Sequence, residues 1–280
     1  MKNITMKKII ALVKKVLKIS SDHDLAVYAG YSTLYILTAA IPLLMVIVAA
    51  VYLMPGFSVD DFQAFLFQFI PEVPEIQNLL ANIIRNLSSQ TSSFVASVSA
   101  VTSIWSASAG ISAIQKGLDK LYGTSSKGLM AKVKALLYTV LFTFQILAML
   151  VFQVLGSSIK GILRSLASSF VILKGIEKFA SVINASSIIV GLITVVVILL
   201  TYTYLPGGKR VLKKQVPGAV FTAVIWVIFS IVFSIFIPRF WKASSLYGSL
   251  ASIFLMTMWL RIMITILFYG ACLNEGLKSE

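Results

Sequence analysis

The chain has few of the residues from which catalytic and metal sites are usually built. Its 280 residues include one cysteine, Cys272, one histidine, His23, and ten aspartate and glutamate residues in total. A single cysteine excludes an internal disulfide, and the sparse histidine and acidic residues do not cluster into a metal-ligand pattern. The sequence also lacks a P-loop, a nucleophile elbow and a dinucleotide-binding fingerprint. We therefore expect no enzymatic activity, no bound metal and no cofactor.

Charged residues are scarce as well, at 12% of the chain, whereas hydrophobic residues make up 58% and the mean hydropathy is +0.93. Soluble domains typically carry about 25% charged residues, so this composition indicates a membrane protein with several spans. The formal charge of +14 does not indicate nucleic-acid binding, because the basic residues concentrate in short segments between apolar runs. We accordingly expect no nucleic-acid partner.

Six apolar stretches are long enough to cross a bilayer, which takes roughly 20 helical residues. We predict an all-α polytopic membrane protein in which residues 1–280 form one integral domain. Its six transmembrane helices are predicted at about 25–54, 93–114, 135–156, 181–204, 216–237 and 249–273.

Amphipathic segments are predicted outside these spans. Residues 1–24 form a basic amphipathic segment whose lysines suit the anionic inner leaflet, so membrane lipids are the expected partners. Between the first and second spans, helical periodicity predicts two short amphipathic helices on the extracytoplasmic face. Residues 157–180 are basic and amphipathic, and an interfacial or partly re-entrant helix remains open there.

Basic residues also predict the orientation of the chain. With the N-terminus inside, 16 of the 24 lysines and arginines fall in cytoplasmic segments and seven in outer segments. Because cytoplasmic loops carry the excess of lysine and arginine, both termini are expected in the cytoplasm. No cleaved signal peptide is expected, since the N-terminal segment lacks a signal-type apolar region with a small-residue cleavage site.

The remaining basic residue, Arg261, lies near the middle of the last predicted span. Thr257 and Thr265 lie four residues to either side, so the three side chains form one polar stripe on a helix. A charge at this depth is costly and usually faces a pathway. We interpret the stripe as a contact for an anionic headgroup in a polar cavity. The alternative is a structural arginine bonded to buried carbonyl groups or glutamines.

Other polar side chains are candidates for the same cavity. Ser99, Ser103 and Ser106 lie in the second predicted span, and Tyr31 lies in the first. Small hydroxyl residues also allow ordinary close packing of membrane helices, and this alternative stays open. Three prolines are candidate hinges, although a proline kink can equally be static geometry: Pro42, Pro206 and Pro217.

Four stretches of the chain carry longer motifs. They are YAGYSTLYILTAAIPLL at 28–44, WSASAGISAIQKGLDKLYG at 105–123, YTYLPGGK with VPGAVFTAVIW at 202–226, and LYGSLASIFLMTMWL with YGACLNE at 246–275. Together they resemble the YihY/BrkB family of bacterial inner-membrane proteins, once labelled ribonuclease BN. The resemblance implies an envelope function in the bacterial cytoplasmic membrane, with transport of lipids or lipid-linked precursors among the proposed roles. Where the family usually has an acid in its last helix this chain has Cys272, so a role of that carboxylate would require Glu275 as a substitute.

We hypothesise from these features a transporter or flippase that binds an anionic amphiphile, such as a lipid or a lipid-linked precursor. Two alternatives belong to other classes: a non-transporting envelope scaffold or regulator, and an exporter of small solutes or ions. The sequence is compatible with a homo-oligomer and does not determine the oligomeric state.

Overall fold

The computed structural model describes residues 2–52, 58–69, 74–90, 93–145, 185–240 and 249–278, and these ranges contain helices and no β-strand. An unlabelled helical segment covers 128–145. The labelled elements are α1 (Lys2–Asp22), α2 (Leu25–Tyr52), α3 (Val59–Phe69), α4 (Pro74–Gln90), α5 (Ser93–Leu121), α8 (Ala185–Tyr204), the 3-10 turn η2 (Leu212–Gln215), α9 (Val216–Phe240) and α11 (Ser249–Lys278). The predicted all-α class is confirmed for this part of the chain.

Within the described residues, two helical stretches are long and apolar enough to cross a membrane, Leu212–Ile237 and Ile253–Lys278. Shorter apolar helical stretches lie at Leu25–Ala40 and Gly191–Tyr204. One surface of α9 exposes large apolar side chains, including Val220, Val224, Val227, Ile228, Ile231 and Val232. Such a surface suits lipid better than water. The count of six spans stays a prediction, because 146–184 lies outside the described residues.

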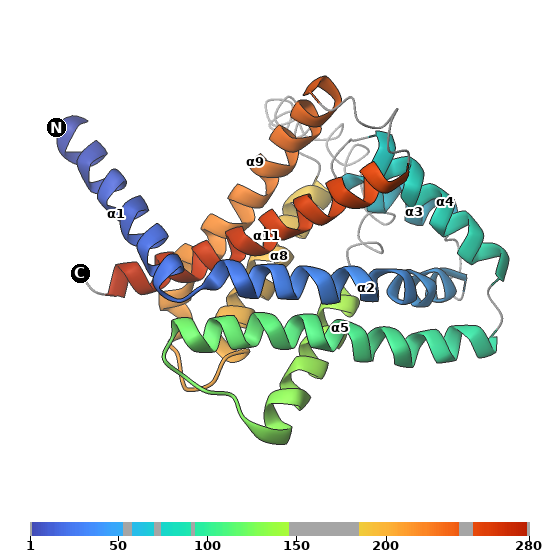
Figure 1. The fold of residues 1–280 in the computed structure, drawn as a ribbon, viewed down its shortest axis with the longest axis horizontal. Helices are drawn as coiled ribbons and strands as arrows, with labels where there is room; N and C mark the ends of the chain where they lie inside the picture. Colours follow the sequence, from blue (N-terminus) through green and yellow to red (C-terminus); the bar gives the residue numbers. More distant parts are fainter. Residues whose placement is uncertain are drawn as a thin grey trace, which may run out of the picture.

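The long helices run alongside one another (Figure 1). α2 and α5 are antiparallel and make the most extensive helix pair in the described structure, α11 runs beside α2, and α9 crosses α11. Glycine allows the α2–α5 approach: a Cβ on Gly110 would lie 2.6 Å from Cγ1 of Ile36. Small residues at a helix contact let two backbones come close, as in other membrane bundles.

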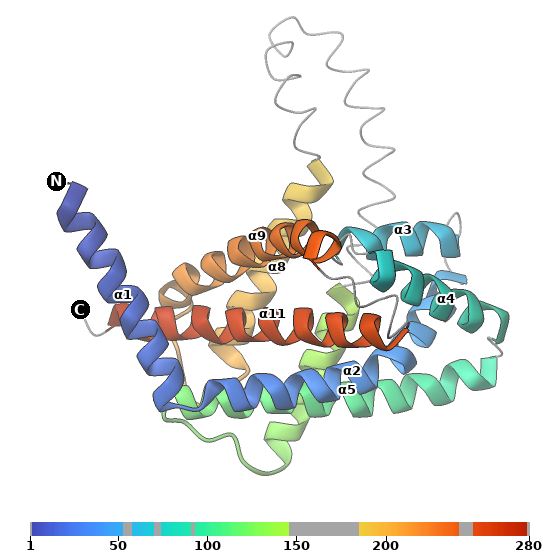
Figure 2. The same cartoon turned by 45° about the horizontal axis from the view of Figure 1, so that its top comes forward.

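One hydrophobic cluster, called here the cap cluster, joins α3 and α4 to α2, α9 and α11. Figure 2 shows α3 and α4 at the end of the bundle opposite to the chain termini. Their apolar faces are buried against the long helices because an amphipathic helix is stabilised by covering its apolar stripe. The buried members of the cap cluster are Leu44, Phe62, Ile76, Leu80, Ile84, Phe233, Ile237 and Leu255.

A second hydrophobic cluster, called here the base cluster, lies where α2 begins, α5 and α8 end, α9 begins and α11 approaches its C-terminus (Figure 1). Helix α1 contributes partly buried side chains to it through Val16 and Ile19. Its buried members are Leu25, Ala29, Ile111, Ile114, Leu118, Leu121, Ala135, Ile198, Tyr202, Leu205, Ala219, Ile264, Leu267, Phe268, Ala271 and Cys272. Helix α11 therefore contributes residues to both clusters, and its middle lies between them.

Candidate functional site

Arg261 lies in the middle of α11, between the residues that this helix gives to the cap cluster and to the base cluster. Its side chain is exposed, so the structure does not enclose it in the inward orientation that the sequence led us to expect. The hydroxyls of Thr257 and Thr265 donate to the carbonyl oxygens of Ile253 and Arg261, at 2.7 and 2.8 Å. The two threonines therefore bond to their own helix, and the polar stripe is reduced to the guanidinium.

The helical face that carries Arg261 is covered at one end and open at the other. Phe268 and Cys272 share this face, seven and eleven residues further on, and both are buried in the base cluster. Phe268 packs so closely on α5 that a Cβ on Gly117 would lie 2.6 Å from its Cζ. Phe254, seven residues before Arg261 on the same face, is 54% exposed. Arg261 therefore lies at the boundary on this face of α11 between a part that is buried against α2 and α5 and a part that is exposed.

Of the other candidate residues for this cavity, the structure describes the side chains of Tyr31 and Ser106. Tyr31 is 46% exposed, and its hydroxyl lies 3.2 Å from the hydroxyl of Tyr35 on the outer surface of α2. Ser106 is half-buried on α5, whereas the side chains of Ser99 and Ser103 lie outside the described part of the structure. Their proposed role in binding an amphiphile stays a prediction.

The three candidate hinges occupy different settings. Helix α2 runs unbroken through Pro42, and Figure 2 shows α2 bending in its second half. Pro206 lies in the turn after α8. Pro217 is the second residue of α9, in the first helical turn, where the missing N–H has no intrahelical partner to lose. Nothing in this geometry shows motion at the three positions.

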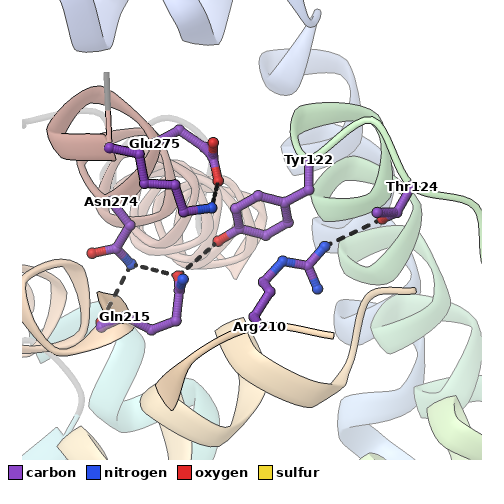
Figure 3. A network of polar contacts seen from close by, with 7 residues as sticks. Tyr122, Thr124, Arg210, Gln215, Asn274 and Glu275 are labelled. Atoms are coloured by element: carbon purple, nitrogen blue, oxygen red, sulfur yellow. Dashed lines mark hydrogen bonds and ion pairs between the residues drawn. The ribbon is translucent and has the colours of Figure 1, made fainter. Parts of the chain in front are cut away.

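The structure assembles a different polar group next to the base cluster, which we call the polar junction; Figure 3 shows part of it. It is formed by residues from the end of α5, the connection between α8 and α9, and the end of α11. Its members are Gln115, Asp119, Tyr122, Thr124, Arg210, Gln215, Asn274 and Glu275.

Two buried side chains of α5 hold the turn that follows α8. Gln115 donates through Nε2 to the carbonyl oxygen of Leu205 at 2.8 Å. One turn later, Asp119 accepts from the backbone N–H of Gly207 at 2.7 Å and from that of Ser126 at 2.8 Å, and the hydroxyl of Thr124 donates to it at 2.8 Å. A buried carboxylate is stable when its oxygens accept several hydrogen bonds. Asp119 therefore fixes the loop after α5 against the turn after α8.

A second set of hydrogen bonds joins the start of α9 to the end of α11. Asn274 accepts from the backbone N–H of Gly218 at 2.7 Å and donates to Oε1 of Gln215 at 3.0 Å. The hydroxyl of Tyr122 donates to the same Oε1 at 3.3 Å, so α5 joins the set. Both Gln215 and Asn274 are buried, and side-chain networks of this kind rigidify a core when their members are paired.

Arg210 stacks on the tyrosine of this network. Its Cζ lies 3.9 Å from the centre of the Tyr122 ring, and its Nη2 donates to the hydroxyl of Thr124 at 3.3 Å. Burial lowers the pKa of the guanidinium and raises the pKa of the Tyr122 phenol. The Nζ of Lys278 lies 5.4 Å from the same ring centre and pairs with Glu275. Two cations therefore flank one aromatic ring, an arrangement that cation–π attraction supports.

Some residues of the polar junction could have been singled out from their positions in the sequence, although composition and hydropathy did not identify them. Gln115 and Asp119 lie four residues apart at the end of an apolar helix, and Asn274 ends the last apolar run. These residues lie in two of the four motif stretches, but the distance along the chain gives no indication that they meet. Within the described residues, no three histidine, cysteine, aspartate or glutamate side chains are placed to hold a metal ion.

Comparison with known proteins gives one family match and two relatives. The family model for virulence factor BrkB matches residues 16–280. The Bacillus subtilis (strain 168) protein YfkH, whose name describes it as ribonuclease-like, is 27% identical over 226 residues, which cover 80% of this chain and 79% of YfkH. The UPF0761 membrane protein PSHAa0171 of Pseudoalteromonas translucida (strain TAC 125) is 24% identical over 269 residues, covering 92% and 83% of the two chains. No solved structure matches the chain significantly.

Proposed function

Because the chain belongs to the BrkB family of membrane proteins, we propose that it resides in the bacterial cytoplasmic membrane and moves an anionic amphiphile, a lipid or a lipid-linked precursor. In this proposal the chain crosses the membrane several times, and both termini lie in the cytoplasm. Arg261 makes the contact with the anionic headgroup. The role is one of binding and movement and includes no catalytic step.

The exposed position of Arg261 is the observation that carries this proposal. A guanidinium near the middle of a membrane helix costs about 2.5–3.5 kcal/mol on insertion scales. Among the described residues no hydrogen bond or ion pair to the Arg261 guanidinium offsets this cost; the bond from Thr265 is to the backbone carbonyl of Arg261. A phosphate or carboxylate group would supply a bidentate partner, and the open face of α11 gives it access from the side. Lateral access suits a molecule with acyl chains better than a small solute that needs an enclosed pore.

Helix α1 supports the proposed cytoplasmic N-terminus. Its exposed apolar side chains Ile10, Val13 and Leu17 form one stripe, and Lys14 and Lys18 lie beside it on the helical wheel. An apolar stripe bordered by lysines is typical of helices that lie in the interface of an anionic leaflet. A different face of α1 binds α11, where Lys15 donates to the carbonyl oxygen of Gly276 at 2.7 Å. Helix α1 thus combines a protein contact with a surface suited to lipid headgroups.

Movement of a fluorescent lipid by purified protein in liposomes tests the proposal. The wild-type protein should move a headgroup-anionic reporter such as labelled phosphatidylglycerol between leaflets, and Arg261→Gln should reduce the initial rate at least tenfold. Arg261→Lys keeps the charge and should keep part of the rate, whereas Lys127→Gln, in the exposed loop after α5, should leave it unchanged. Equal rates for wild type and Arg261→Gln would remove the role of Arg261.

A non-transporting scaffold is the second candidate, and the polar junction favours it. The polar residues of the junction are largely hydrogen-bonded to other parts of the same chain. Their contribution to folding is therefore enough to account for them, and no transported substrate is needed. This candidate predicts that the protein moves no lipid in liposomes and co-purifies from native membrane with one defined envelope protein.

Incubation of the purified protein with RNA tests the activity that the name of YfkH suggests for that protein, and we expect no cleavage.

A further inference from the structure

Two hydrogen-bond donors in the polar junction are buried without an acceptor. One is Nε2 of Gln215, whose side chain is 0% exposed, and the other is Nη1 of Arg210. Buried polar groups in folded proteins are nearly always paired, because an unpaired donor loses its bond to water and gains nothing in return. Two such donors in one network, linked through Tyr122, indicate that an accepting group is missing there, although Ser126 Oγ and Trp259 Nε1 are also buried without a partner.

Neighbouring bonds hold both donors in place. The carbonyl of Gln215 accepts from Asn274 and from Tyr122, so turning the amide over would set its NH2 group against the NH2 group of Asn274. The guanidinium of Arg210 is fixed by its stacking on Tyr122 and by its bond to Thr124. Tyr122 connects the two, since its ring contacts Arg210 and its hydroxyl contacts Gln215 (Figure 3). The two free N–H groups therefore belong to one rigid frame.

The charges around this frame select an anion. Lys278 Nζ lies 5.4 Å from the centre of the Tyr122 ring, and three exposed lysines lie close to Arg210 and Gln215 in the sequence, namely Lys209, Lys213 and Lys214. The two nearby carboxylates are already engaged, because Asp119 accepts three hydrogen bonds and Glu275 pairs with Lys278. Asp119 and Glu275 favour the charged form of the half-buried Arg210 without bonding to it, so an anionic acceptor at Nη1 would add a direct counter-charge. A tetrahedral oxyanion supplies several acceptor oxygens and negative charge together, and arginine binds such groups in a forked geometry.

We propose that the polar junction binds a phosphate group, which accepts from Nη1 of Arg210 and Nε2 of Gln215 beside the Tyr122 ring. The site is separate from Arg261 and does not depend on transport. Its ligand is a phosphoryl oxyanion, carried either by a lipid headgroup or by free phosphate. Because the ligand would join α5, the α8–α9 connection and α11, its binding should stabilise the folded protein according to its concentration.

Thermal unfolding of the full-length protein in a non-ionic detergent tests the site. Inorganic phosphate should raise Tm in a saturable way, compared with sodium chloride at matched ionic strength. Arg210→Gln and Gln215→Glu should abolish that shift, since the first removes the charge and the second sets a carboxylate against the anion. Lys127→Gln, which removes an exposed charge outside the polar junction, should retain it. A short-chain phosphatidylglycerol tested in the same way separates the sources: a shift with the lipid alone assigns the site to a headgroup.

A direct measurement covers the case in which a variant does not fold. Equilibrium dialysis of the wild-type protein against radiolabelled phosphate, and against labelled short-chain phosphatidylglycerol, should give saturable binding of at least one probe. Arg210→Lys, which keeps the charge and loses the fork, should weaken that binding at least tenfold. If neither probe binds in a saturable way, or if Arg210→Lys and Arg210→Gln bind as well as wild type, the site does not exist. These outcomes are independent of lipid movement, so failure of the transport proposal leaves them unaffected.

Discussion

Gly218 on α9 and Gly270 on α11 meet backbone to backbone where the two helices cross. A Cβ on Gly270 would lie 2.7 Å from the carbonyl oxygen of Gly218 and 2.6 Å from the hydroxyl of Tyr202. That hydroxyl is buried and donates to the carbonyl oxygen of Leu267 at 2.6 Å, so it has little freedom to move. The approach of α9 to α11 is what brings Asn274 within 2.7 Å of the Gly218 N–H and completes one side of the polar junction.

Gly270→Ala should therefore destabilise the protein. The added methyl group meets backbone and a fixed side chain, and overpacking of this kind costs about 1–3 kcal/mol. Thermal unfolding in detergent measures the loss as a lower Tm. Gly30→Ala is the matched control, because a Cβ at Gly30 meets nothing within 4 Å and alanine favours the helix. An unchanged Tm for Gly270→Ala would contradict the close crossing of α9 and α11.

Asp119→Asn should loosen the polar junction without changing the volume of the side chain. The amide offers one accepting oxygen and turns an NH2 group towards the N–H of Gly207 or Ser126, which leaves at least one buried donor unpaired. Such a loss costs about 1–3 kcal/mol. Thermal unfolding, together with proteolysis of the loop after α5, should show the effect. Asp22→Asn, at an exposed position, serves as the control. Equal stability of the two variants would show that Asp119 does not hold the loop after α5 against the turn after α8.

The ion pair between Asp24 and Lys120 should make stability depend on pH. The Lys120 ammonium, which donates to the Asp24 carboxylate at 2.6 Å, lowers the pKa of that carboxyl, and the same bond raises the pKa of Lys120. A lowered carboxyl pKa gives stability that is lost as pH falls through it, and a raised lysine pKa gives stability that is lost as pH rises through it. The pair therefore stabilises the folded state between these two pKa values.

Lys120→Gln should lower Tm slightly near neutral pH, and the difference from wild type should vanish below the pKa of Asp24. Both side chains are exposed, so a small effect is expected. Asp24 has a φ of 52°, in the left-handed region, and Asp24→Asn is the suitable partner variant because asparagine tolerates that conformation. A Tm difference that persists unchanged at acid pH would show that the pair is not its source.

Site-directed labelling can test the placement of α1 at the membrane surface. The native Cys272 is buried, so a cysteine introduced into α1 can be labelled selectively. A fluorophore at Val13→Cys, in the exposed apolar stripe, should be quenched by spin-labelled lipid in anionic liposomes. The same fluorophore at Lys14→Cys should respond mainly to a quencher in water. Equal quenching from water at both positions would place α1 away from the bilayer.

The structure also shows how far individual residues could be anticipated from the sequence. Hydrophobic runs predicted helices at α2, α5, α8, α9 and α11 because helix formation and membrane insertion depend on local composition. The polar stripe at Arg261 followed from four-residue spacing, but spacing does not show whether a neighbouring helix covers that face. Arg261 proved to be exposed, and the two threonines bond to their own helix.

The sequence by itself determined the class of the protein, the scarcity of catalytic side chains, and the family resemblance that the BrkB model confirms over residues 16–280. The tertiary structure decided that Gln115, Asp119, Gln215 and Asn274 converge, although 159 positions separate the first from the last. The physical reason is that hydropathy and periodicity are local properties, which predict the secondary structure of a segment and which of its faces is apolar. Pairing between buried polar groups depends on which helices cross, and here glycines at the crossing of α9 and α11 set that geometry.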